Sequence, residues 1–363
     1  MIPGPLTTRA DVSETKRLTR LDVLRGIAAS AVILFHYHIL FAAPGSAVVV
    51  RQGLPWQSIL WPVYTYGNLA VPFFWLLSGI VFQHSYGTAP IALRSFFVRR
   101  FARLYPLHFA TLMIMAALNL LSLLVFRHPV GEGNTLPNFV EQLLMASHWV
   151  GAGHRSFNYP IWSVSMEVLA YAAFFLFLRF TGRGFPQLIA VAALATAVAL
   201  GFANYQATCV ALFFIGCIVI RVAPVVAMRL ALLGAVAAAA VIGAIALSPL
   251  ARHTLLAAEY GLFPALLLVV AKVDLTHPPV GMTWLGDFSY GIYLTHVPLL
   301  TIAGMAFEGG VPNPARQPWF LVAFIALVLV VASLSYRWLE RPAQRLILRW
   351  QFYRDPPRPS PDW

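Results

Sequence analysis

Residues 21–38, LDVLRGIAASAVILFHYH, form a long apolar run that contains two ionisable side chains, Arg25 near its start and His36 deep inside it. A run of this length and composition is typical of a transmembrane helix. The two residues are eleven positions apart, so they leave the same face of a helix about 16 Å apart along its axis. Ionisable groups inside a membrane span are costly and by default mark a function. Taken singly, Arg25 could instead be an interfacial anchor and His36 a packing residue.

The composition extends this interpretation to the whole chain. Of 363 residues, 60% are hydrophobic and only 10% are charged, whereas soluble domains carry about 25% charged residues. We therefore expect an all-α, polytopic membrane protein with about ten transmembrane helices. The expected spans are 21–43, 62–84, 103–126, 160–180, 186–203, 205–222, 229–248, 254–272, 284–305 and 318–339. Residues 137–150 are too short and too polar a run to span, so we expect a re-entrant or surface helix there.

The basic residues predict how the chain is oriented. The formal net charge is +12, but the basic side chains gather at the ends of the expected spans, which argues against a nucleic-acid partner. With the N-terminus in the cytoplasm, twenty of the 25 Lys and Arg residues lie on the inner side. This bias predicts that both termini are cytoplasmic. We expect a flexible cytoplasmic tail over residues 1–20, a membrane domain over residues 21–345, and a cytoplasmic C-terminal tail over residues 346–363.

Three polar residues on three expected helices come out at a similar depth. Counted along their spans, His36, Glu167 and His296 lie roughly 18 to 22 Å above the inner boundary of the membrane. Glu167 is the only acidic residue that this count places deep in a span, and a carboxylate there needs a partner. A His–Glu pair would orient His36 as a general base towards a hydroxyl group. The alternative is a buried polar network that only fixes helix packing.

A basic cluster is expected at the inner face, in the segment RSFFVRRFARLYPLH. Arg100 and Arg103 are three residues apart and are therefore neighbours on a helix surface. Paired guanidinium groups are suited to binding phosphates, although any inner loop collects arginines. A phosphate held there and by Arg25 would lie about 16 Å from His36. A long, narrow acyl carrier such as CoA can span that distance.

Other motifs narrow the possibilities. The pair Ser78-Gly79 in PFFWLLSGIVF permits the close approach of another helix or a ligand. The sequence lacks a GxSxG elbow, a Walker-type loop, an HExxH motif and a CxxC motif. Hydrolase, ATPase and zinc functions therefore have no support from motifs, and no metal is expected.

Together these motifs resemble those of the acyltransferase-3 family, bacterial integral-membrane O-acyltransferases that modify surface polysaccharides and other acceptors. The segments that carry the resemblance are RLDVLRGIAASAVILFHYH, VPFFWLLSGIVF, RRFARLYP, IWSVSMEVLAY, FSYGIYLTH and SYRWLERP, in the family's order. The resemblance implies a membrane domain of about ten helices with cytoplasmic termini. It also implies transfer of an acyl group, usually acetyl, from cytoplasmic acyl-CoA to a hydroxyl group.

The resemblance also implies roles for individual residues. His36 is similar to the family's essential histidine, Arg25 to its partner, and Arg100 and Arg103 to the arginine pair that handles the donor. We expect these three arginines to bind acyl-CoA and Glu167 to orient His36. The residues expected to contact the substrate are Trp162, Ser165, Tyr290, Tyr293 and His296.

The sequence thus leads to the hypothesis of an O-acyltransferase of the bacterial inner membrane that acts on a glycan, a glycolipid or another envelope-associated acceptor. His36 would either deprotonate the acceptor hydroxyl or carry the acyl group in a covalent intermediate; the sequence leaves both open. Some family members carry a fused extracytoplasmic domain, and this chain stops after a short tail, so a separate extracytoplasmic partner protein is an expectation. The alternatives are a transporter or flippase for a lipid-linked sugar and a non-catalytic partner in an envelope assembly.

Overall fold

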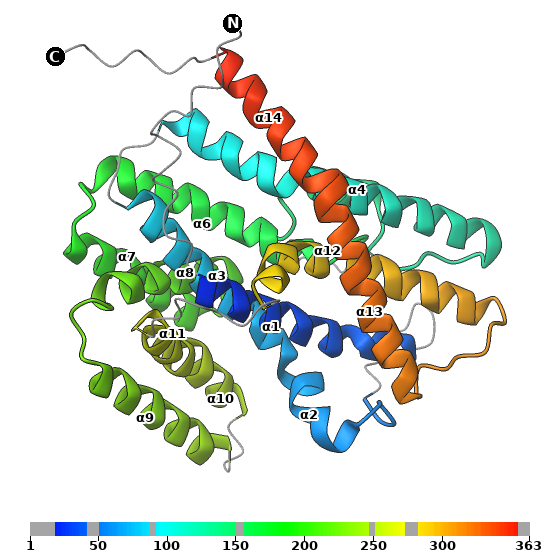
Figure 1. Ribbon diagram of the computed structural model, residues 1–363, viewed down its shortest axis with the longest axis horizontal. Helices are drawn as coiled ribbons and strands as arrows, with labels where there is room; N and C mark the ends of the chain where they lie inside the picture. The colour runs from blue at the N-terminus through cyan, green and yellow to red at the C-terminus, as the bar shows by residue number, and fades with distance from the viewer. Residues whose placement is uncertain are drawn as a thin grey trace, which may run out of the picture.

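The computed structural model describes residues 19–41, 51–87, 92–131, 133–149, 156–246, 251–272 and 282–354, and its regular elements are all helical (Figure 1). In chain order the elements are α1 (Thr19–His36), η2 (Tyr37–Phe41), α2 (Gln57–Tyr66), η3 (Gly67–Leu69), α3 (Ala70–Tyr86), α4 (Leu93–Val125), α5 (Leu136–Leu143), α6 (Ile161–Phe180), α7 (Phe185–Phe202), α8 (Tyr205–Val222), α9 (Met228–Ala246), α10 (Ala251–Ala257), η4 (Ala258–Leu262), α11 (Phe263–Lys272), α12 (Met282–Glu308), α13 (Pro318–Ser335), η5 (Tyr336–Glu340) and α14 (Arg341–Arg354).

The predicted all-α, polytopic membrane architecture is confirmed. In the part of the chain that the structure describes, nine helical segments are long and apolar enough to cross a membrane. The sequence predicted ten, and the difference lies in the run 229–248. That run forms α9 (Met228–Ala246), whose described apolar part covers Met228–Ala244, and residues 247–250 at the end of the predicted span lie outside the described ranges.

The helix ends do not coincide with the predicted domain boundaries. Thr19 and Arg20 already belong to α1, and residues 1–18 lie outside the described ranges. The boundary predicted after residue 345 falls inside α14, which is helical as far as Arg354. Figure 1 shows α13 and α14 as one long helix, joined through the π-helical turn η5, with α14 lying against α4.

Helices α3 and α8 cross at a pair of glycines. A Cβ atom on Gly79 would overlap the carbonyl oxygen of Phe213, and a Cβ atom on Gly216 would overlap that of Leu76. Each helix thus presents a glycine to the backbone of the other, and only a hydrogen atom fits at either position. The close approach predicted for Ser78-Gly79 is confirmed.

Helices α1 and α12 pack along each other and run in the same direction (Figure 1). Near their starts, Gly26 touches the Leu285 side chain and Gly286 touches Asp22, so that neither glycine has room for a Cβ atom. This contact sets the register of the two helices. His36 lies ten residues beyond Gly26, and His296 lies ten residues beyond Gly286. The two histidines are therefore brought to the same height, about 15 Å from the glycine contact.

The segment before α6 runs back into the bundle. The ring Nε2 of His108 on α4 lies 2.7 Å from the carbonyl oxygen of Gln142 on α5. Asn158 donates a 3.0 Å hydrogen bond to the carbonyl oxygen of Leu294 on α12, which would otherwise bond the N–H that Pro298 lacks. Leu294 lies twelve residues from the start of α12 and fourteen from its end. Helix α6 therefore begins inside the bundle, about 21 Å from the far end of α12, and α5 belongs to a re-entrant segment.

Candidate functional site

A cavity of about 370 Å³ lies among α1, α3, α4, α6, α12 and α14. Among the described residues that line it are four arginines and a single carboxyl group, that of Glu167. The arginines are Arg25, Arg99, Arg100 and Arg103. Such an excess of guanidinium groups favours an anionic ligand, and phosphates are the anions that arginine binds best. We call the part of the cavity next to Arg99, Arg100 and Arg103 the arginine end.

Arg100 is held in place by aromatic rings. Its guanidinium carbon lies 4.0 Å from the centroid of the Phe82 ring, and its Nη2 donates a 2.9 Å hydrogen bond to the hydroxyl of Tyr86. The Nε atom of Arg100 is buried and has no hydrogen-bond partner among the described residues. A buried N–H group of a guanidinium normally has an acceptor. Arg100 is therefore equipped to donate to a ligand in the cavity.

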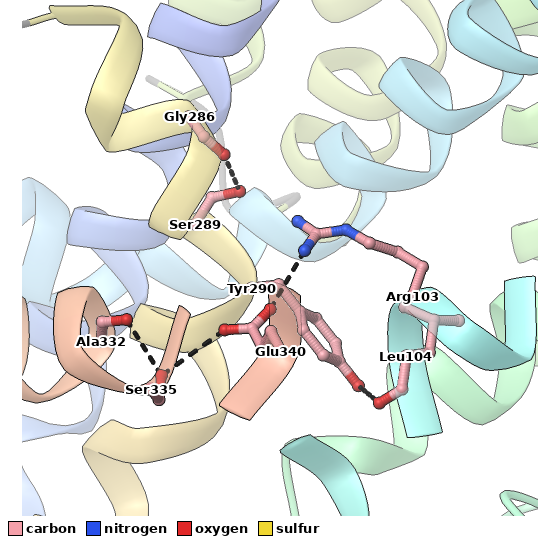
Figure 2. A network of polar contacts seen from close by, with 8 residues as sticks. All are labelled: Arg103, Leu104, Gly286, Ser289, Tyr290, Ala332, Ser335 and Glu340. Atoms are coloured by element: carbon pink, nitrogen blue, oxygen red, sulfur yellow. Dashed lines mark hydrogen bonds and ion pairs between the residues drawn. The ribbon is translucent and has the colours of Figure 1, made fainter. Parts of the chain in front are cut away.

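Arg103 forms an ion pair with an acidic residue that sequence reasoning missed. Its Nη1 lies 3.0 Å from Oε2 of Glu340, whose side chain is only 3% exposed (Figure 2). The Ser335 hydroxyl shares its one proton between the carbonyl oxygen of Ala332 at 2.9 Å and the other carboxylate oxygen of Glu340 at 3.4 Å. Tyr290, beneath Arg103, donates to the carbonyl oxygen of Leu104 at 2.7 Å. This network joins α4, α12 and the π turn η5, and the only signal for Glu340 in the sequence is its place in SYRWLERP.

Glu167 belongs to the side of the cavity that holds the arginines. Its Oε1 atom accepts hydrogen bonds from the Ser78 hydroxyl and, at 2.7 Å, from the Tyr171 hydroxyl. The ring of Tyr171 stacks on the ring of Phe82 with 4.4 Å between centroids. The same Phe82 ring contacts the guanidinium group of Arg100. The carboxylate is thus satisfied by two hydroxyl groups, as a buried acid requires.

The predicted histidines form a pair beyond the other end of the cavity. Nδ1 of His36 lies 2.9 Å from Nε2 of His296, and the two rings are nearly parallel with centroids 5.0 Å apart. The ring of Tyr159 meets His36 edge-on at 5.1 Å. Tyr293 lines the cavity, and its ring centroid lies 6.1 Å from that of His296. Its hydroxyl is 2.6 Å from the Ser163 hydroxyl, and Tyr293 is thus the lining residue that contacts the histidine pair.

The structure does not bring His36 and Glu167 together, although the sequence analysis paired them. The hydrogen bonds of Glu167 go to Ser78 and Tyr171, whereas His36 bonds to His296. The reason is the depth at which α6 begins. The depth count placed the start of α6 at the membrane surface, but the re-entrant segment moves the whole helix towards the arginine end. Ser163 lies at the level of Tyr293, to which it is bonded. Glu167 lies about 6 Å farther along α6, towards the arginines. The histidine pair lies on the other side of Tyr293.

The remaining predicted residues divide into two groups. Arg25, Arg100, Arg103, Tyr290 and Tyr293 line the cavity together with Glu167. Trp162 and Ser165 are not among the described residues that line it. The ring of Trp162 packs against Trp75 and Tyr205, and the carbonyl of Ser165 accepts a 2.9 Å hydrogen bond from the indole of Trp149. The structure therefore places these two residues at the contact between α6 and its neighbours.

A further acidic residue corrects the statement that Glu167 is the only acid deep in a span. Glu259 lies within the candidate span His253–Lys272, in the π-helical turn η4. It does not line the cavity that Glu167 shares with the arginines.

Comparison with known proteins agrees with this geometry. Residues 18–337 match the acyltransferase-3 family model, described as an acyltransferase domain. The chain is 28% identical to the acyltransferase MdmB of Streptomyces mycarofaciens, over 95% of this chain and 96% of that protein. It is 24% identical to the peptidoglycan O-acetyltransferase OatA of Listeria monocytogenes, over 91% of this chain but only 56% of that protein's length. No solved structure matches the chain significantly. Because the family match covers most of the sequence, the chain belongs to the acyltransferase-3 family.

Proposed function

We propose that this protein is an O-acyltransferase of the cytoplasmic membrane that moves an acyl group, in the simplest case acetyl, from acyl-CoA to a hydroxyl group of a glycan or another envelope-associated acceptor. The proposal is based on the arrangement of the site. Four guanidinium groups line the cavity, and a pair of histidines lies beyond its far end. The family match supplies the reaction class, acyl transfer.

The donor is proposed to bind with its phosphates among the arginines. Arg25, Arg99 and Arg100 line the cavity and are offered as phosphate ligands, while Arg103 is partly neutralised by Glu340. The pantetheine arm then passes Glu167, which accepts hydrogen bonds from hydroxyl groups in the structure and can accept them from the amide N–H groups of the arm. The thioester reaches Tyr293 and, next to it, the histidine pair.

The proposed chemistry centres on His36. Its imidazole takes the proton of the acceptor hydroxyl while the oxygen attacks the thioester carbonyl carbon. The C–S bond then breaks, and the departing thiolate of CoA takes the proton from His36. The products are the acyl ester and free CoA. A covalent acyl-histidine intermediate is the variant of this mechanism, and it would release CoA in the absence of acceptor.

The acceptor and the location are inferred from a relative and from the distribution of basic residues. The Listeria relative is named as a peptidoglycan O-acetyltransferase, which supports a glycan acceptor at a distance of 24% identity. The bias of basic residues towards one side supports a cytoplasmic arginine end, where acyl-CoA is available. A separate extracytoplasmic protein that receives or presents the acceptor fits this arrangement.

The experiment uses the purified protein in lipid nanodiscs with acetyl-CoA labelled in the acetyl group. Release of free CoA and transfer of label to added glycan acceptors are measured for the wild type, for His36→Ala and for His253→Gln. His253 is an exposed histidine on α10 and serves as the matched control. We expect His36→Ala to abolish transfer and His253→Gln to retain it. Full transfer by His36→Ala would refute the mechanism, and saturable binding of acetyl-CoA or glycan without any turnover in the wild type would refute the enzyme.

The donor site is tested separately with Arg100→Ala. Loss of a charge-assisted hydrogen bond is worth about 1.5–3 kcal/mol, so the KM for acetyl-CoA should rise roughly ten- to hundredfold while the KM for the acceptor stays constant. Arg229→Ala, which removes an exposed arginine outside the cavity, is the control for the loss of positive charge. An unchanged donor KM in Arg100→Ala would remove that arginine from the donor site.

A further inference from the structure

Both ring nitrogens of His296 have a hydrogen-bond partner. Nδ1 lies 3.2 Å from the carbonyl oxygen of Ile292, one turn earlier on α12. Nε2 lies 2.9 Å from Nδ1 of His36. A carbonyl oxygen can only accept a hydrogen bond, so Nδ1 of His296 must carry a proton.

The surroundings of His296 determine the state of its other nitrogen. The side chain is fully buried, and its neighbours on α12 include the buried Tyr293, Leu294 and Val297. A second proton would place a positive charge in this interior, which is costly inside a membrane protein. His296 is therefore neutral, and its Nε2 bears a lone pair that accepts a hydrogen bond.

The proton between the two rings must then come from His36. Because Nε2 of His296 accepts, Nδ1 of His36 donates and holds the proton of a neutral imidazole. In this tautomer Nε2 is the nitrogen of His36 that carries no proton. The chain of contacts from the Ile292 carbonyl through His296 to His36 thus selects one tautomer of His36.

We propose that His296 is the positioning residue of the acyl transfer reaction, and that it fixes both the tautomer and the orientation of His36 so that Nε2 receives the acceptor proton. This inference rests on the proposed function. It replaces the role that the sequence analysis gave to Glu167, whose hydrogen bonds go elsewhere. The register between α1 and α12 supports it, because the glycine contacts near the start of both helices hold the two rings at one height.

In the proposed reaction His296 neither gains nor loses a proton. When Nε2 of His36 takes the hydroxyl proton, the Nδ1–H group of the resulting imidazolium keeps its hydrogen bond to the neutral His296. The acceptor oxygen forms its bond to the acyl carbon and the C–S bond breaks. The proton then leaves Nε2 of His36 for the thiolate of CoA.

The kinetic test compares His296→Leu with His296→Gln in the purified full-length protein with acetyl-CoA and acceptor. Leucine fills the space and offers no acceptor, whereas the side-chain carbonyl of glutamine can accept from Nδ1 of His36. General-base catalysis is typically worth about 10²- to 10⁴-fold, so we expect His296→Leu to lower kcat at least a hundredfold with less than a twofold change in the donor KM. His296→Gln should recover tenfold or more of that loss. Equal loss in both variants, or a loss expressed in the donor KM, would overturn the inference.

Nitrogen-15 NMR of histidine-labelled protein gives a readout that does not depend on turnover. The resonances of His36 are identified by their absence in His36→Ala. We expect His36 to be protonated at Nδ1 in the wild type and to lose this preference in His296→Leu. Protonation of wild-type His36 at Nε2 would overturn the inference even if acyl transfer is confirmed. Conversely, a wild type with the expected tautomer and no acyl transfer would leave the pair intact and refute the proposed function alone.

Discussion

Removing Arg103 should destabilise the protein more than removing Glu340, although each substitution breaks the same ion pair. The Glu340 side chain is 3% exposed, whereas that of Arg103 is 26% exposed and borders the cavity. In Arg103→Met the carboxylate is stranded in the interior, and among the described residues its other donor is the Ser335 hydroxyl, which is shared with the Ala332 carbonyl. In Glu340→Leu the guanidinium can turn towards the cavity and water. The two halves of one interaction therefore have unequal costs.

The magnitudes follow from the burial of each partner. Breaking a buried ion pair by removal of one member costs about 3–5 kcal/mol when the other charge stays buried, which applies to Arg103→Met. For Glu340→Leu we expect roughly 1–2 kcal/mol, because the partly exposed arginine regains solvent. Replacement of both charges by apolar residues is often close to neutral. The double variant should therefore be about as stable as Glu340→Leu and more stable than Arg103→Met, with a coupling energy of about 3–5 kcal/mol.

The two cysteines of the chain provide the assay. Cys209 and Cys217 are both buried, so a thiol-reactive fluorogenic dye in detergent solution reports unfolding as they become exposed. We expect thermal midpoints in the order wild type, double variant close to Glu340→Leu, and Arg103→Met lowest. Equal midpoints for the two single variants, or strictly additive losses in the double variant, would refute the assignment of unequal burial costs.

Three further predictions use the same assay. Gly79→Ala should cost about 1–3 kcal/mol through overpacking against α8, while Gly201→Ala, where the added Cβ meets open space, should cost nothing measurable; equal midpoints would refute the glycine contact. The hydrogen bond to Glu308, 2.6 Å long, raises the pKa of His128 above its usual range, so the pair stabilises the fold fully below about pH 6.5 and loses its contribution as the pH rises through the raised pKa. The midpoint should therefore fall as the pH is raised from about 6.5 through the raised pKa of His128, and a fall of the same size in Glu308→Gln would count against this pair. Tyr293→Phe, which deletes the hydroxyl bonded to Ser163 and keeps the ring, should lower stability by about 0.5–1.5 kcal/mol; measured acyl-CoA KM should stay unchanged, and a rise would mean that the hydroxyl itself contacts the donor.

The helices and the arginine end were predictable because their causes are local. A membrane span must satisfy its own backbone hydrogen bonds, so an apolar run such as residues 160–180 becomes a helix, here Ile161–Phe180, whatever surrounds it. Arg100 and Arg103 lie within one turn of α4 and reach the same cavity for the same reason. The similar depth of His36 and His296 was also predictable, because both residues were counted from the same end of two helices that run in the same direction.

Partners from distant segments were not predictable in this way. Arg103 and Glu340 are 237 residues apart in the chain, and Glu340 lies beyond the expected end of its span at residue 339. Its burial depends on the continuation of α13 through a π turn into α14, which packs against α4. From the sequence alone, a charged residue at the end of a span is predicted to be exposed to solvent. The sequence pattern of one span does not show which other helix packs against it.

The depth of Glu167 shows why counting from a helix end fails in this fold. The count assumes that each helix begins where the membrane begins, but α6 begins where Asn158 bonds the carbonyl of Leu294 that Pro298 leaves without its helical partner. A proline on α12 therefore determines the position of an acid on α6. This displacement puts the Glu167 carboxylate beside the arginines and leaves the histidine pair with the re-entrant segment on one side and Tyr293 on the other. Such a placement suits a reaction in which an anionic donor arrives through the arginines and an uncharged acceptor hydroxyl arrives from the side of the re-entrant segment. In that arrangement the acid guides the donor, and the pair of imidazoles handles the proton.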